Sequence, residues 1–319
     1  MTANSTTRQA TQSTTWVLAL CMLCTACTAT PTQTPLAKQT AAQSNNALVL
    51  QADFSGVVML GVARSVSKDL DVYNIRPLIP LYDIKAASDS LAYNAQTWPG
   101  GTVFVSVVDP GVGTPRKSVV LRTKNDLYFV SPDNGSLSGP ATQYGIAEVR
   151  EIDESVNRIP GSQWAHTFHG RDVYSYTGAR LAAGVISYEQ VGPKLPSAVI
   201  ELPRATGRLE DGVLYGHVAG GIGRLGNVFF SIDRALFETF EPALGENYEL
   251  TINQGSRVVW QGLIPYVKSF GGVAVGENLL FIDSSGNLSA AINQGNFADE
   301  NGITDAGPDW QITLKKPSP

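Results

Sequence analysis

The order of apolar and polar positions divides the folded part of the chain into two regions with different periodicities. In the first region, strand-like apolar runs alternate with segments whose apolar residues have helical spacing. The strand-like runs are 47–54, 102–108, 117–123 and 127–130, and the helical segments are 83–96 and 173–183. The run 57–66 fits a helix or a buried strand equally well. This alternation predicts a three-layer α/β domain with a mostly parallel sheet over residues 47–191.

The second region consists of short β-like runs separated by glycine turns. The runs are 212–219, 227–232, 249–252, 257–263 and 279–282. This pattern predicts a small all-β domain, a sandwich or a barrel, over residues 207–319. Residues 192–206 contain three prolines and are predicted to be a linker between the two domains.

The first residues of the chain predict export. Residues 1–26 have the plan of a signal peptide, because the apolar run 16–23 is too short for a permanent membrane span. The run leads to Cys24-Thr25-Ala26-Cys27, which resembles a bacterial lipoprotein cleavage site with Cys27 as the acylated residue. Ordinary signal-peptide cleavage and a retained anchor remain alternatives. Residues 27–46, rich in Thr, Pro, Gln and Ala, are predicted to be a flexible tether. The expected location is therefore the bacterial cell envelope, with a lipid anchor holding the protein on the periplasmic or extracytoplasmic side of a membrane.

Composition narrows the function classes. The 319 residues are 43% hydrophobic and 16% charged, as in a globular protein. The net charge of −5, without a block of lysine or arginine, makes nucleic acid an unfavourable partner. The chain has no Gly-x-Ser-x-Gly elbow and no His/Cys cluster, so neither a serine hydrolase nor a metal or redox cofactor is expected. Residues 221–226 fit a dinucleotide glycine pattern, but strand-like residues follow them, which predicts a hairpin turn.

Two segments carry the candidate chemistry. The first follows the strand-like run 102–108 and places Asp109 and Arg116 around a Pro-Gly turn. The second is residues 167–172, which supply the imidazole of His169. An Asp before Pro-Gly can simply cap a turn, and a lone Arg or His is often structural. Together, however, a carboxylate, an adjacent guanidinium and an imidazole could orient and deprotonate a water molecule.

These segments, with Ser131-Pro132-Asp133-Asn134-Gly135 between them, closely resemble the S-adenosyl-L-methionine hydroxide adenosyltransferases. The resemblance extends over about residues 48–296. It implies that a water held by an Asp-Arg-His set attacks the ribose 5′ carbon and releases adenosine and L-methionine. Asp109, Arg116 and His169 match that set. The halogenating relatives replace the turn that holds Asp109, so the intact aspartate favours water as the nucleophile.

The same resemblance implies positions for substrate binding and an assembly. Asp53 matches an aspartate that binds the ribose hydroxyls, and Tyr82 matches an aromatic residue that packs on the nucleoside. Phe270 matches an aromatic residue that stacks on adenine, although simple core packing is an equal alternative for both aromatic residues. Ser284 and Ser285 match the segment that contacts the adenine edge. Asn227 matches an asparagine that holds the methionine end. The resemblance also implies a homotrimer with sites between the N-terminal domain of one subunit and the C-terminal domain of its neighbour.

Two departures from the family pattern affect the substrate. The loop after Asp53 is short, and Gly223 stands where the family usually has an aspartate that pairs with the substrate's amino group. The leading hypothesis is an exported enzyme that hydrolyses S-adenosyl-L-methionine or a related 5′-substituted adenosine. The rival is an exported non-catalytic lipoprotein that binds nucleosides or acts as a scaffold. We expect His166 and His217 to be structural, and we expect Arg171 and Asp172 to form a charge pair that holds the His169 segment.

Overall fold

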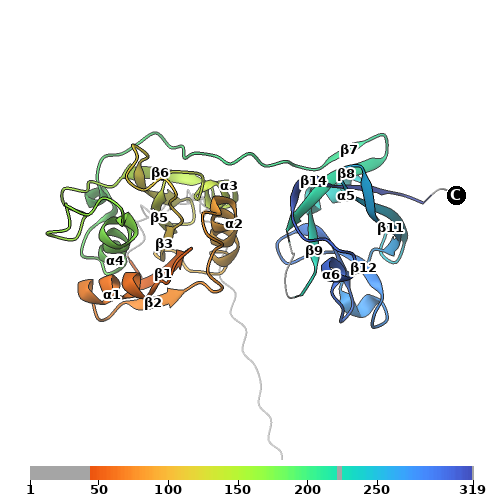
Figure 1. Cartoon of the computed structure of the whole chain (residues 1–319), viewed down its shortest axis with the longest axis horizontal. Coiled ribbons are helices and arrows are strands. Elements are labelled where there is room, and N and C mark those ends of the chain that lie inside the picture. The colour runs from red at the N-terminus through yellow and green to blue at the C-terminus, as the bar shows by residue number, and fades with distance from the viewer. Residues whose placement is uncertain (1–43, 221–224, 318–319) are drawn as a thin grey trace, which may run out of the picture. The chain divides into compact units, whose positions relative to one another are not determined.

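The computed structural model describes residues 44–220 and 225–317, and two separate sheets account for its strands (Figure 1). Sheet A has six strands in the order β2-β1-β3-β5-β4-β6. They are β1 (Ala47–Ala52), β2 (Asp71–Asn74), β3 (Val103–Val107), β4 (Ser118–Thr123), β5 (Tyr128–Pro132) and β6 (Ile146–Glu151). The chain thus has an N-terminal α/β domain built on sheet A.

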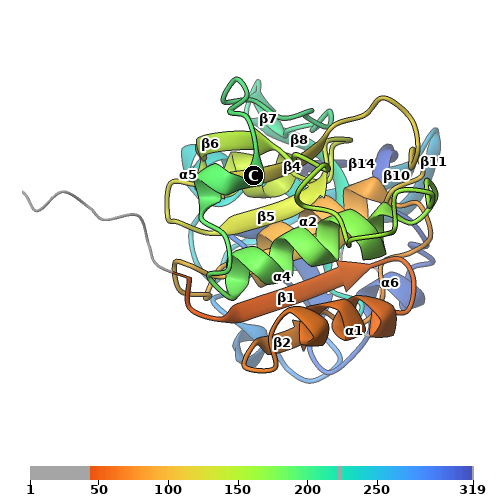
Figure 2. The ribbon, with the colours of Figure 1, turned by 90° about the vertical axis from the view of Figure 1, so that its left-hand side faces the viewer.

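Helices cover both faces of sheet A. Helices α1 (Val57–Val66) and α4 (Tyr176–Ala182) pack on one face, with the π-helix η1 (Gly170–Ser175) leading into α4 (Figure 2). Helices α2 (Ile84–Asn94) and α3 (Ser138–Tyr144) pack on the other. Alternate residues of β1 supply the two cores: Leu48 and Leu50 face α1 and α4, whereas Val49 faces α2. These two cores confirm the predicted three layers. Residues 57–66, for which a helix and a strand were both possible, form helix α1.

Sheet A is mixed, which modifies the expectation of a mostly parallel sheet. Strands β2, β1, β3 and β5 pair in parallel, but β4 runs antiparallel to both of its neighbours, β5 and β6. The reason is local: only residues 124–127 separate β4 from β5, too few for a crossover helix. The expected helix 173–183 also differs, since it starts earlier as a π-helix immediately after His169.

Sheet B forms a C-terminal domain of antiparallel strands. Its order is β11-β10-β14-β8-β9-β13-β12, with β7 paired to β8, and an isolated bridge between Tyr266 and Leu280 nearly closes it. The strands are β7 (Arg208–Glu210), β8 (Val213–Gly220), β9 (Val228–Asp233), β10 (Asn247–Gln254), β11 (Arg257–Pro265), β12 (Asn278–Ile282), β13 (Asn287–Ile292) and β14 (Gly307–Lys315). The short helices α5 (Arg234–Thr239), α6 (Phe297–Glu300) and η3 (Phe270–Gly272) connect them, and η2 (Tyr188–Val191) precedes them. Sheet B therefore agrees with the expected all-β region.

The topology of sheet A determines where a site can form. From β1 the chain moves to β2 on one side and then crosses to β3 on the other side of β1. In such sheets, ligands bind beyond the carboxyl ends of the two strands at which the order reverses. Asp53 directly follows β1 and Asp109 comes shortly after β3. The backbone N–H of Asp53 donates to the carbonyl of Val107 at 3.4 Å, so these two strand ends are adjacent.

Candidate active site

Asp109 and Arg116 form a forked ion pair beyond the end of β3. Arg116 Nε donates to Asp109 Oδ1 at 2.7 Å, and Arg116 Nη2 pairs with Asp109 Oδ2. The side chains are only 5% and 10% exposed, for Asp109 and Arg116 respectively. Asn134, in the turn after β5, donates from its side chain to the carbonyl of Val108 at 2.9 Å and so supports the backbone beside Asp109. The sequence-predicted pair is therefore buried and rigidly oriented.

His169 joins this pair from the residue that precedes η1. Its Nδ1 lies 3.2 Å from Arg116 Nη2. Gly170 allows the approach, because a Cβ atom there would lie 2.7 Å from Val107 Cγ1 and 3.3 Å from Phe54 Cζ. The neighbouring Phe168 packs edge-on against Phe54, with 5.5 Å between ring centroids. The structure thus brings together the three residues that the sequence predicted as a catalytic set.

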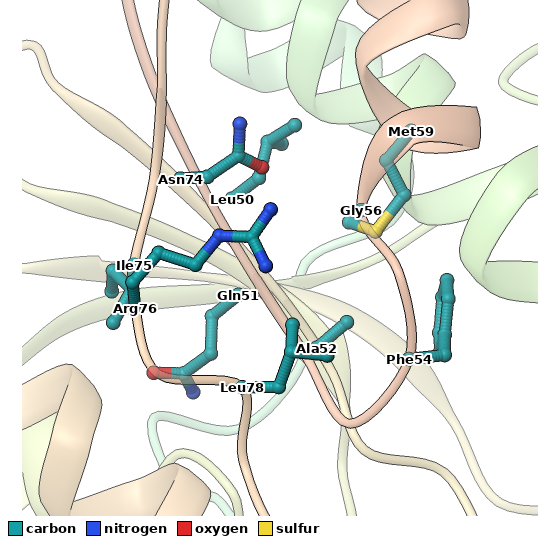
Figure 3. Close-up of a pocket in the computed structure, with 10 residues that line it drawn as sticks. All are labelled: Leu50, Gln51, Ala52, Phe54, Gly56, Met59, Asn74, Ile75, Arg76 and Leu78. Atoms are coloured by element: carbon teal, nitrogen blue, oxygen red, sulfur yellow. The ribbon is translucent and has the colours of Figure 1, made fainter.

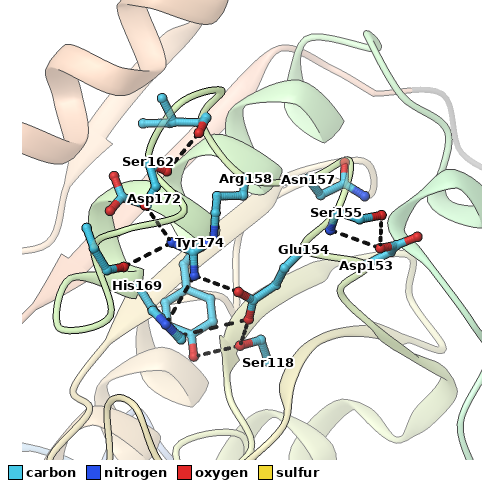
Figure 4. A network of polar contacts seen from close by, with 12 residues as sticks. Ser118, Asp153, Glu154, Ser155, Asn157, Arg158, Ser162, His169, Asp172 and Tyr174 are labelled. Carbon is cyan, nitrogen blue, oxygen red and sulfur yellow. Dashed lines mark hydrogen bonds and ion pairs between the residues drawn. The ribbon is translucent and has the colours of Figure 1, made fainter.

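The other side of the imidazole contacts residues that the sequence analysis missed. Arg158 Nη2 lies 3.2 Å from His169 Nε2 and donates to Glu154 Oε2 at 2.7 Å (Figure 4). Glu154 Oε1 accepts from Ser118 Oγ at 3.3 Å, and Ser118 Oγ lies 3.1 Å from the Tyr174 hydroxyl. A polar network therefore surrounds the ring. The only sequence signal for it was a Glu and an Arg four residues apart upstream of His169.

Burial and charge set the protonation of these groups. Burial lowers the pKa of His169; Arg116 and Arg158 lower it further, while Glu154 and Asp109 act in the opposite direction. Burial alone would lower the pKa of Arg116, but its hydrogen bond to Asp109 and the charges of Asp109, Glu154 and Tyr174 together outweigh burial, and the pKa is raised. Burial raises the pKa of Tyr174 far above its ordinary value. Near neutral pH the site therefore holds a neutral imidazole beside a permanently charged guanidinium.

An open pocket of about 470 Å³ reaches this network. Its wall contains His169, Glu154 and Arg158, together with Gly113 and Thr114 from the turn that follows Asp109. His166, which was expected to be structural, also lines the pocket. A small molecule or water entering the pocket reaches the face of the network that carries the imidazole.

Asp53 and Tyr82 meet at the end of β1. The backbone N–H of Tyr82 donates to Asp53 Oδ2 at 3.0 Å, and Tyr82 is 67% exposed. Only residues 54–56 separate Asp53 from the start of α1, so the loop is as short as the sequence indicates. Beside it lies a cavity of about 10 Å³, lined by Phe54, Gly56 and Arg76 among others (Figure 3). That volume holds about one water molecule, so this cavity is too small for a nucleoside.

The remaining predicted binding residues belong to the C-terminal domain. Asn227 lies in the short segment before β9 and is half-buried. Phe270 begins η3 and packs on Phe281, with 5.1 Å between ring centroids, which is the core-packing alternative. Ser284 and Ser285 are exposed in the turn between β12 and β13.

The structure also bears on the residues that were expected to be structural. Arg171 and Asp172 form the expected charge pair, with Nε to Oδ1 at 2.7 Å. His217 lies in β8, where burial lowers its pKa. Cys27 and Gly223 lie outside the described residues. Within residues 44–220 and 225–317, no helix is long and apolar enough to cross a membrane.

Two protein-family models match this chain. The model of the SAM hydroxide adenosyltransferase N-terminal domain matches residues 48–192, and the model of the C-terminal domain matches residues 222–309. The two matched ranges contain sheet A with its helices and most of sheet B.

Individual relatives agree with the family models. The chain is 33% identical to a protein from Salinispora tropica named (R)-S-adenosyl-L-methionine hydrolase, over 76% of this chain and 87% of that relative. It is 25% identical to a fluorinase from Actinopolyspora mzabensis, over 75% and 86% of the two chains. A crystal structure of an uncharacterized conserved protein from Thermotoga maritima is similar with a TM-score of 0.76 and 30% identity, covering 84% of this chain and all of that one.

Proposed function

The chain belongs to the SAM hydroxide adenosyltransferase family, and on this premise we propose that it hydrolyses S-adenosyl-L-methionine to adenosine and L-methionine. In this step water oxygen forms a bond to the ribose 5′ carbon while the bond from that carbon to sulfur breaks. The electron pair of the broken bond stays on sulfur, which converts the sulfonium to the neutral thioether of methionine. One proton of the attacking water is released.

Asp109, Arg116 and His169 have distinct roles in this proposal. The Asp109 carboxylate, oriented by Arg116, accepts a hydrogen bond from the water and fixes its direction of attack. His169, as a neutral ring, accepts the proton that the water loses or hydrogen-bonds to it. Much of the acceleration comes from holding the water in line with the carbon–sulfur bond.

One observation supports this proposal above the others. Asp109, Arg116 and His169 come from segments up to 60 residues apart, yet they contact one another at the point where the strand order of sheet A reverses. A turn cap and an isolated structural histidine would not need a shared guanidinium. The intact Asp109 also favours water over a halide, although relatives named fluorinase match the chain.

The substrate-binding roles extend the proposal. Asp53 binds the ribose hydroxyls, because a carboxylate can accept two hydroxyl hydrogen bonds, and Tyr82 packs on the nucleoside. Asn227, Phe270, Ser284 and Ser285 hold the methionine and adenine ends from the C-terminal domain of a neighbouring subunit in a homotrimer. Light scattering of the purified protein tests the trimer, and a monomer that still turns over substrate would exclude shared sites.

The decisive experiment incubates the purified full-length chain with S-adenosyl-L-methionine and follows adenosine and L-methionine by chromatography. Asp109→Ala provides the negative control. Equal amounts of both products, formed only by the intact protein, are the expected result. Binding of substrate without turnover would favour the rival, a non-catalytic nucleoside-binding lipoprotein. A product other than adenosine would show that a different nucleophile or substrate is used.

We also propose that Cys27 carries a lipid and anchors the protein in the bacterial cell envelope. The support is the sequence of the leader, in which an apolar run precedes Cys24-Thr25-Ala26-Cys27. Labelling cells with a tagged fatty acid tests this, since the label should enter the intact protein and not the Cys27→Ser variant. Label retained in the variant would refute acylation at this position.

A further inference from the structure

His169 lies at the centre of a chain of five charged or titratable side chains. On one side, Asp109 pairs with Arg116, whose Nη2 faces Nδ1 of the ring. On the other side, Glu154 pairs with Arg158, whose Nη2 faces Nε2 of the ring. Each guanidinium therefore holds its own carboxylate and offers a further N–H to the same imidazole. The sequence-predicted trio is therefore part of a larger network in which each ring nitrogen faces a guanidinium.

This arrangement restricts the charge of the ring. A guanidinium has donors only, so an imidazolium would direct both of its N–H groups at cations. A neutral ring, in contrast, can accept a hydrogen bond from one of them. Two negative charges, Asp109 and Glu154, favour the protonated ring, and Glu154 Oε1 lies 4.0 Å from His169 Nδ1. Tyr174 packs edge-on against the His169 ring, with 6.5 Å between ring centroids. Glu154 is the strongest of the charges that favour an imidazolium, and burial together with the two guanidinium groups acts against it.

Arg158 also holds the segment that carries the imidazole. Its Nη1 donates to the carbonyl of Ala165 at 3.2 Å and to that of Ser162 at 3.4 Å, both within the loop that leads to His169. The Arg158 side chain is 7% exposed, and Figure 4 shows it extending between this loop and Glu154. One buried guanidinium thus links the loop, the carboxylate and the ring.

We propose that Arg158, held in place by Glu154, is a positioning residue for His169 that fixes the His169 segment and keeps the imidazole neutral as a hydrogen-bond acceptor. The catalytic consequence rests on the proposed function, because the ring must accept from water in the hydrolytic step. Entry of the water replaces one of the two guanidinium contacts, each 3.2 Å long. The charge effect on the ring does not depend on any substrate.

The first test is a histidine titration by NMR without substrate, in the full-length protein and two charge-neutralised variants. The chain has three histidines, and loss of a signal in His169→Asn identifies His169. Arg158→Gln removes a cation and should raise the pKa of His169 by about half a unit or more. Glu154→Gln removes the opposing charge and should lower that pKa. Opposite shifts are the signature of this arrangement.

The controls separate charge from structure. Arg122→Gln makes the same charge change in a partly exposed ion pair with Asp126, also four residues away, and should leave the His169 titration unchanged. Arg158→Lys keeps the charge but loses the forked contacts. It should preserve the low pKa of His169 while speeding amide hydrogen exchange in residues 162–168. If Arg158→Gln does not fold, Glu154→Gln and Arg158→Lys still decide the question.

The second test measures the pH dependence of kcat/KM in the same proteins. The acidic limb should move to higher pH in Arg158→Gln and to lower pH in Glu154→Gln, following the titrations. Shifts in the same direction, or activity losses without any shift, would overturn the inference. Opposite NMR shifts in a protein that does not hydrolyse S-adenosyl-L-methionine would refute the proposed function and leave the positioning role intact.

Discussion

Two neighbouring parts of the N-terminal domain differ in how completely the chain builds them. Around His169, side chains from β4, the loop after β3 and residues 154–169 hold one another in a continuous polar network. Around Asp53, in contrast, a single backbone N–H donor and the exposed Tyr82 make up the observed arrangement. The polar network around His169 is preorganised within one domain, whereas the surroundings of Asp53 are open.

Because of this difference, mutations in the two regions should affect different kinetic constants, kcat in one and KM in the other. Contacts that orient a nucleophile act in the transition state, so damage to them lowers kcat. Contacts on an exposed rim act on the substrate and the transition state alike, so damage to them raises KM. Mutations in the His169 network should therefore have large effects on turnover, and mutations beside Asp53 should have smaller effects on binding.

The largest expected effect is that of Asp109→Asn. Under the proposed mechanism the variant lacks the carboxylate that orients the water, and kcat should fall by about 10²–10⁴-fold. The change also leaves the buried Arg116 without its ion-pair partner, which costs about 3 kcal/mol of stability. Chromatographic product assays give kcat, and isothermal titration gives substrate affinity, which should remain within a few-fold.

The matched control for Asp109→Asn is Asp126→Asn, which breaks the partly exposed pair with Arg122 in the same domain. It should leave kcat unchanged. Equal losses in both variants would mean that turnover follows general stability and would remove the distinction between the two parts of the domain.

The next effect in size is expected for Asp53→Asn. An uncharged amide accepts hydroxyl hydrogen bonds more weakly than a carboxylate, so KM should rise by about 10-fold or somewhat more. Steady-state kinetics measure it, with the exposed Asp69→Asn as control. A fall in kcat at constant KM would place Asp53 in the chemical step and contradict its assignment to the ribose.

The same comparison shows what sequence can predict. Asp109 is recognisable because an apolar run and a Pro-Gly turn together specify a strand end, and both signals are local. Glu154 and Arg158 carry no comparable signal. A Glu and an Arg four residues apart usually indicate an exposed helix face, and only the tertiary packing of a loop buries this Arg158 against His169.

In the fold, too, local features were predictable from the sequence and features that depend on tertiary packing were not. The strands β1, β3, β4 and β5 and the helices α2 and α4 were predictable from periodicity, but the helical state of residues 57–66 and the direction of β4 were not. The usable signal was the polar turn 124–126, which is too short for a parallel connection. The strands β2, β6, β7, β13 and β14 were missed, because their patterns become meaningful only when neighbouring strands are in place.

A smaller effect is expected for Tyr82→Ala. Loss of aromatic packing on the nucleoside should raise KM by about 3- to 10-fold and leave kcat unchanged. Tyr93→Ala, an exposed tyrosine in α2, is the matched control. An unchanged KM in Tyr82→Ala would mean that the open rim beside Asp53 does not contact the substrate's nucleoside.

The smallest expected effect concerns stability and pH at His169. Its pKa is lower in the folded protein than the ordinary value near 6.5, because burial and the two guanidinium groups disfavour the charged ring. Below that pH the unfolded chain binds a proton that the native state does not, so stability falls as the pH decreases towards the folded pKa. The loss is at most about 1.4 kcal/mol for each pH unit of this window.

Urea unfolding of the wild type and of His169→Asn between about pH 5 and pH 7.5 measures this contribution. His217, whose pKa burial also lowers, adds its own slope, so the difference between the two proteins isolates His169. The wild type should lose more stability on acidification than the variant. Parallel curves would mean that folding leaves the pKa of His169 unchanged. The network around His169 would then differ from the surroundings of Asp53 in burial but not in its effect on the charge of a side chain.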